Sequence, residues 1–166
     1  TSLTRDAAHY GPALALGDVV VTEAGFGSDL GAEKFFDIKC RYSGNIPNAV
    51  VLVATVRALK MHGGAALDQL TQTDTAALSR GLDNLAAHLD SAAKFQRPVI
   101  VAINQFTNDH PDEIALVHEF CQARGVPCAT ANVFGEGGDG AVKLAETVLA
   151  ALPKESKPLK PKPDRS

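Results

Sequence analysis

Two short apolar runs decide how this chain folds: AVVLVA at Ala49–Ala54 and PVIVAI at Pro98–Ile103. Both are continuously apolar and rich in β-branched residues. Strands with this composition are covered on both faces, which is typical of parallel sheets. Two further runs, at Asp18–Thr22 and Pro127–Ala131, are predicted to be additional strands.

Amphipathic segments separate these runs. Ala77–Phe95 carries leucines at helical spacing, and Pro111–Arg124 begins with proline and is followed by glycine, as helices often are. Leu30–Lys39 and Gly140–Leu152 are the remaining predicted helices. Alternation of strands and helices with short connections predicts an α/β fold, a doubly wound and mostly parallel sheet with helices on both faces.

The composition indicates an ordinary soluble domain. The chain has 166 residues, of which 45% are hydrophobic and 21% charged, and its formal net charge is −3. This charge excludes a basic nucleic-acid footprint, and no apolar run reaches the roughly 18 residues of a membrane span. We expect one α/β domain over residues 1–152 and a disordered Lys/Pro-rich tail over residues 153–166.

The cysteines and the first ten residues indicate the cellular compartment in which the protein is expected. The three cysteines have no C-x-x-C spacing, so neither a zinc site nor a thioredoxin motif is predicted. Thr1–Tyr10 carries no secretory signal pattern. We therefore expect a reducing compartment, the cytoplasm or the mitochondrion.

In open α/β sheets, ligands bind beyond the carboxyl ends of the strands. The first loop predicted there contains Glu23, Gly25, Phe26 and Gly27 before a helix. Glycines allow close backbone approach, and a helix N-terminus favours an anion such as phosphate. A plain strand-to-helix turn is the alternative, although a large apolar Phe26 between two glycines is hard to explain by packing. The spacing G-x-G-x-x-x-G differs from the dinucleotide fingerprint.

A second predicted loop, Thr55–Gly64, carries Arg57, Lys60 and His62. Such a cluster at the end of a strand is able to clamp a phosphate or carboxylate group. A solvated basic turn is the alternative.

Two more loops each contribute an aromatic side chain. Phe106 lies beside Asn and Asp residues, and Phe134 lies in a glycine-rich segment. Together they are suited to sandwich one planar heterocycle, whereas the alternative for Phe106 is a ring folded into the core. The chain contains no G-x-x-x-x-G-K-[ST], H-E-x-x-H or G-x-S-x-G motif.

These residues resemble a known family. Val19–Arg41 and Ala49–Gly64 are closely similar to formate–tetrahydrofolate ligase, and Val99–Asp109 and Gly137–Ala145 also resemble it. The resemblance covers about Gly17–Leu152, after which the tail departs from the family. It implies part of a P-loop NTPase-like fold.

The resemblance also implies an activity, substrates and a site. Members use ATP with Mg to phosphorylate formate, and then transfer the formyl group to tetrahydrofolate. They are homo-oligomers. By this resemblance Phe106 stacks on the pterin, Phe134 stands where the family usually has Trp, and Phe26 lines the same site. Thr107 replaces a family proline.

The family's P-loop is not among the matched residues. Phosphoryl transfer depends on positioning and electrostatic clamping, so we do not expect this chain alone to make formyl phosphate. Three hypotheses remain open: a part of the ligase, an inactive relative that binds folate, and a structural partner.

Overall fold

The structure is a computed structural model that describes residues 13, 15–25 and 27–153. The chain divides into two compact units: Ala49–Leu152 forms one, and Thr1–Asn48 with Pro153–Ser166 forms the other. The predicted Lys/Pro tail falls, apart from Pro153, outside the described residues. Within the described part of the chain, no helix is both long and apolar enough to cross a membrane.

A three-stranded parallel sheet forms the centre of the Ala49–Leu152 unit. Its strands are β1 (Val50–Ala54), β2 (Val99–Asn104) and β3 (Cys128–Ala131), in the order β1-β2-β3. Val50 pairs with Val99, and Val101 pairs with Cys128. The strands that the apolar runs predict in this unit are therefore confirmed, as is their parallel direction.

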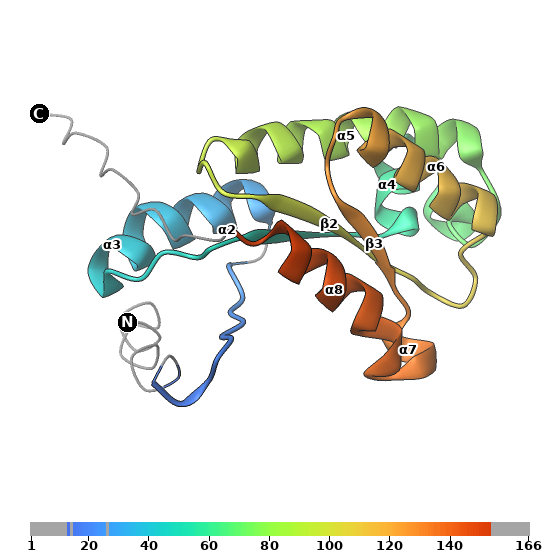
Figure 1. The fold of residues 1–166 in the computed structure, drawn as a ribbon. Coiled ribbons are helices and arrows are strands. Elements are labelled where there is room, and N and C mark those ends of the chain that lie inside the picture. The colour runs from blue at the N-terminus through green and yellow to red at the C-terminus, as the bar shows by residue number, and fades with distance from the viewer. Residues whose placement is uncertain (1–12, 14, 26, 154–166) are drawn as a thin grey trace, which may run out of the picture. The chain divides into compact units, whose positions relative to one another are not determined.

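Helices cover one face of this sheet, and the main core lies there. They are α4 (Val56–His62), α5 (Thr75–Ala93) and α6 (Pro111–Ala123), all on the same side of the strands (Figure 1). Alternate strand residues point into this core, as the two-residue period of a strand requires. The core contains Leu52, Ala54, Val56, Leu59, Leu78, Leu82, Leu85, Leu89, Val101, Ile103, Val117 and Cys121.

On the opposite face, α8 (Val142–Ala151) packs against β3 and β2. The strand residues of the other parity, such as Ile100 and Ala102, are buried on this face. Val51 and Val53 of β1 share that parity but are 41% and 63% exposed. Helices thus lie on both faces of the sheet, as the alternation predicts.

The two longest helices of this unit, α5 and α6, begin at side chains that accept backbone N–H groups. Asp74 accepts from Ala77 N at 2.8 Å before α5. His110 forms a capping box with Glu113 before α6, and proline follows at the first helical position. Gly125 follows α6 with a φ of +66°, a conformation that glycine adopts without strain.

The other unit contains a nearly continuous helix. It consists of α2 (Ser28–Lys34), a π-helical turn (Phe35–Lys39) and α3 (Cys40–Ser43), where the sequence predicts a helix over Leu30–Lys39. The strand predicted at Asp18–Thr22 is wrong, because these residues have no regular secondary structure. A strand needs a neighbouring strand for its backbone hydrogen bonds, and the described residues provide none here.

The three cysteines are free thiols, and two of them interact between α6 and β3. A hydrogen bond from the Cys128 thiol lowers the pKa of Cys121, although burial opposes this shift. The same hydrogen bond, then burial and the charge of Cys121, raise the pKa of Cys128. Proton loss is therefore unequal within this pair, since one thiol supports the thiolate of the other.

Candidate functional site at the carboxyl edge of the sheet

The three parallel strands end at one edge of the sheet, and the chain leaves that edge three times. β1 leads to α4, β2 leads to the loop before α6, and β3 leads to α7 (Val133–Glu136) (Figure 1). The loop before α6 contains Phe106. The N–H of Gln105 donates to the carbonyl of Ala131 at 3.0 Å, which ties the second connection to the third. This geometry brings together residues that lie far apart in the sequence.

Arg57 and Phe106 are in direct contact at this edge. The guanidinium carbon of Arg57 lies 4.9 Å from the centre of the Phe106 ring, which is a cation–π arrangement. Both side chains are half-buried. The structure therefore unites a residue predicted to hold a phosphate with one predicted to stack on a flat ligand.

The predicted basic loop is instead largely a helix. Thr55 is the N-cap of α4, and its hydroxyl accepts from Ala58 N at 3.1 Å. Val56 and Leu59 are buried and hold α4 against the core. The prediction of a loop at Thr55–Gly64 is therefore wrong for Val56–His62. Three basic residues make this segment look polar, although Val56 and Leu59 form the apolar face of a short helix.

The ammonium group of Lys60 points into the protein. Lys60 is 1% exposed, and its Nζ lies 3.0 Å from Oε1 of Glu113, which is itself fully buried. Nζ also donates to the carbonyl of Gln72 at 2.8 Å. The charge of Lys60 is thus matched inside the protein, whereas His62, at the end of α4, is exposed.

Phe134 lies on α7 and is 83% exposed. Its helix is held by Asn132, whose side-chain oxygen accepts from Gly135 N at 3.3 Å and whose amide nitrogen donates to Glu136 at 3.1 Å. Gly140 permits the next turn, since a Cβ there would lie 2.3 Å from the Asn132 carbonyl oxygen. A large aromatic ring is therefore presented to solvent on a constrained segment.

Sequence reasoning missed two buried acids that shape this edge. Asp109, only 8% exposed, accepts from Phe106 N at 2.9 Å and donates its own N–H to the Phe106 carbonyl at 3.0 Å. Glu113 accepts from Asp74 N at 2.8 Å in addition to pairing with Lys60. Glu113 lies in the first turn of α6, where an acid usually indicates only helix stability, so its position gave no sign of burial.

The glycine-rich loop belongs to the other unit. Glu23, Gly25 and Gly27 are exposed, and Phe26 lies outside the described residues. The loop folds tightly onto α2, because a Cβ at Gly31 would lie 1.8 Å from the Gly25 carbonyl oxygen. Gly27 precedes the helix with a φ of +77°, which favours glycine.

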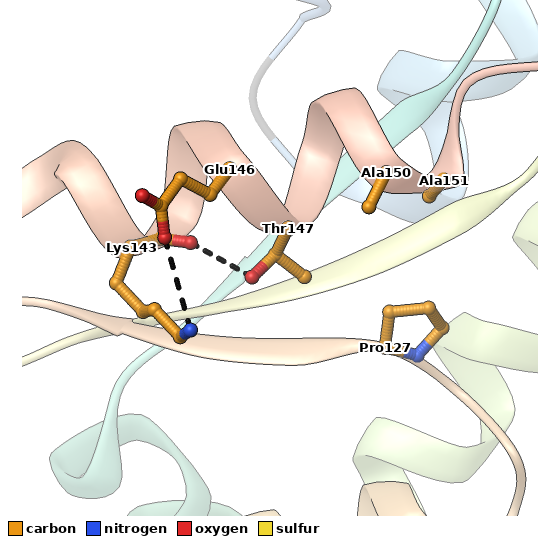
Figure 2. Close-up of a pocket in the computed structure, with 6 residues that line it drawn as sticks. All are labelled: Pro127, Lys143, Glu146, Thr147, Ala150 and Ala151. Atoms are coloured by element: carbon orange, nitrogen blue, oxygen red, sulfur yellow. Dashed lines mark hydrogen bonds and ion pairs between the residues drawn. The ribbon is translucent and has the colours of Figure 1, made fainter.

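A hollow of about 390 Å³ lies elsewhere, between α8 and the start of β3. Figure 2 shows Lys143 and Glu146 paired beside Thr147, with Ala150 and Ala151 near Pro127. None of the candidate site residues lines it. Among the residues that the structure describes, no cluster of three or more His, Cys, Asp or Glu side chains is able to hold a metal ion.

The fold and this edge define a class of protein: a parallel α/β unit whose connections after the strands carry aromatic, basic and glycine-containing segments. Within that class, residues 7–165 match the family model "Formate--tetrahydrofolate ligase". The chain belongs to the formate–tetrahydrofolate ligase family. The match extends beyond Leu152, so the prediction that the tail departs from the family is wrong: a Lys/Pro-rich composition does not preclude a family match.

Two curated relatives support this assignment. The chain is 59% identical to the formate–tetrahydrofolate ligase of Maricaulis maris (strain MCS10) over 136 residues, which is 82% of this chain and 24% of that protein. It is 50% identical to the one of Granulibacter bethesdensis (strain ATCC BAA-1260 / CGDNIH1) over 149 residues, 90% of this chain and 26% of that protein. The chain therefore spans about a quarter of the length of these relatives.

Proposed function

We propose that this chain forms the folate-binding part of a formate–tetrahydrofolate ligase. In the intact enzyme, ATP with Mg phosphorylates formate, and the N10 amine of tetrahydrofolate then attacks the formyl carbon and releases phosphate. The product is 10-formyltetrahydrofolate, a carrier of one-carbon units. Family membership over residues 7–165 supports this proposal.

The observation that carries the proposal is the pair of aromatic side chains at one sheet edge. Phe106 follows β2, and the 83% exposed Phe134 follows the neighbouring strand β3. A pterin is a flat heterocycle, and stacking on an aromatic side chain contributes about 1–3 kcal/mol for the comparable case of nucleic-acid bases. The Phe134 ring is 83% exposed among the described residues, which leaves its faces open to a flat ligand.

For the phosphate and nucleotide groups of the substrates, we propose segments of the chain and no single binding residue. We propose that the loop of Glu23, Gly25 and Gly27, with Phe26, lies on the substrate side of the intact enzyme, as the family resemblance implies. His62 is exposed and remains available for such a role, whereas Lys60 is occupied by Glu113. ATP is proposed to bind parts of the enzyme other than the strand-end loops described here.

The three strands are proposed to belong to a larger doubly wound sheet of the P-loop NTPase type. Val51 and Val53 support this, because they leave apolar surface of β1 exposed to solvent. We also propose a homo-oligomer in the cytoplasm or mitochondrion, by family resemblance.

The second candidate function is folate binding without catalysis, or a structural partnership with a complete ligase. The exposed Phe134 favours folate binding over a purely structural role, because a scaffold does not require aromatic side chains on its loops.

The test is a calorimetric titration of the chain with tetrahydrofolate, with and without ATP and Mg. We expect binding that does not need ATP, and Phe106→Leu weakens it by about 1–3 kcal/mol, since leucine keeps the volume but loses the flat face. Phe95→Leu is the matched control, because Phe95 lies at the opposite end of β2. Equal affinities of the wild type and Phe106→Leu would refute the assignment of this site.

A further inference from the structure

The Arg57 side chain has an unusual set of partners. Its guanidinium lies 4.9 Å from the Phe106 ring centre, and in the described part of the chain no carboxylate pairs with it. Its Nε is buried and has no hydrogen-bond partner among the described residues. Arginine side chains that are partly buried commonly form an ion pair with a carboxylate. Here the guanidinium lies over the Phe106 ring instead.

The position of Arg57 is also unfavourable for its own helix. It lies in the first turn of α4, where the N-terminal partial positive charge disfavours a cation, and no acidic residue in that turn compensates. Helix stability therefore does not account for an arginine here. Among the residues that the structure describes, the contact with Phe106 is the interaction that remains.

The backbone and the ring of Phe106 are held by different residues. Asp109 forms two hydrogen bonds with the Phe106 backbone, at 2.9 Å and 3.0 Å. These bonds fix the loop but leave rotation of the side chain free. The guanidinium over the ring supplies the missing restraint through a cation–π contact.

We propose that Arg57 is a positioning residue for the folate site: it occupies one face of the Phe106 ring and so fixes the other face for stacking on the pterin. This inference rests on the proposed function above. A cation on one face also draws electron density from the ring, which strengthens its stacking with the electron-rich tetrahydropterin on the other face. Arg57 then acts through Phe106 without touching formate or phosphate.

The test compares Arg57→Met, which keeps length but removes charge, with Arg57→Lys, which keeps a cation. We expect Arg57→Met to weaken tetrahydrofolate binding by about three- to thirty-fold, as loss of a cation–π contact implies. Arg57→Lys restores part of this loss. The matched control is Arg124→Met, because Arg124 lies 5.7 Å from the Phe120 ring centre at the far end of α6. This control leaves folate binding unchanged.

A spectroscopic measurement separates positioning from general stability. In the wild type we expect the Arg57 Nε–H proton to resonate upfield, because it lies near an aromatic ring, and Phe106→Leu returns it to the usual position. An Arg57 signal that is the same in the wild type and in Phe106→Leu overturns the inference, even if Arg57→Met fails to fold.

The two proposals fail in distinguishable ways. If Phe106→Leu weakens binding while folded Arg57→Met binds like the wild type, Arg57 is not a positioning residue and the folate site stands. If neither substitution changes the affinity, or the wild-type chain does not bind, the proposed function fails and the inference fails with it.

Discussion

Phe106 illustrates what single residues contribute to this site. Its ring contacts the guanidinium group of Arg57, and its backbone is hydrogen-bonded to the buried Asp109. The sequence predicts Phe106 and Arg57 as site residues because both follow strands of a parallel sheet. Their direct contact is not predictable in this way, because it depends on the rotamers of two side chains. The buried acids Asp109 and Glu113 are missed because their partners are backbone groups and a distant lysine.

The Lys60–Glu113 ion pair gives a prediction about stability. Both side chains are almost fully buried, so removing one charge leaves the other charge buried without its partner. Lys60→Met is expected to lower the free energy of unfolding by about 3–5 kcal/mol. Urea denaturation followed by circular dichroism measures the change.

The matched control is the double variant Lys60→Met/Glu113→Gln. The glutamine amide is neutral and its oxygen still accepts from Asp74 N, so much of the lost stability returns. A single variant as stable as the wild type would contradict the view that Lys60 is a structural cation.

The elements follow from local patterns where those patterns are complete. β1, β2 and β3 are predicted from apolar runs, α5 from leucines at helical spacing, and α6 from its first proline and the glycine that follows it. The strand prediction at Asp18–Thr22 fails because pairing is not a local property. α4 is missed because Arg57, Lys60 and His62 outweigh its short apolar face, even though Thr55 is a suitable N-cap.

The packing of α4 on α5 depends on glycine, which gives a prediction at the scale of elements. A Cβ at Gly81 of α5 would lie 1.8 Å from the Leu59 carbonyl oxygen of α4. Alanine would favour an isolated helix by about 1 kcal/mol, but separating two packed backbones costs more. We expect Gly81→Ala to lower the free energy of unfolding by about 1–3 kcal/mol.

Thermal unfolding of Gly81→Ala checks this expectation. Ser79→Ala is the control, because Ser79 is exposed on the same helix and its replacement adds no contact. A Gly81→Ala variant with an unchanged or higher thermal unfolding midpoint would contradict this expectation, because α4 and α5 would then move apart without loss of stability.

At the scale of the whole molecule, the chain matches about a quarter of the length of its two curated relatives and contains the carboxyl edge of a parallel sheet. That edge carries the aromatic pair, the basic residues and the caps that hold them. The hollow beside α8 is distinct from it, since Pro127 precedes β3 while Phe134 follows it. We therefore propose that folate binds at the carboxyl edge.

The most direct test is a ¹H–¹⁵N NMR titration of the chain with tetrahydrofolate. We expect the backbone signals of Gln105, Thr107 and Gly135 to shift progressively and to saturate, because these residues flank Phe106 and Phe134 at the carboxyl edge. Signals of Glu146 and Ala150, which line the hollow beside α8, stay in place. Saturable shifts confined to the α8 hollow, or no shifts at all, would contradict the account.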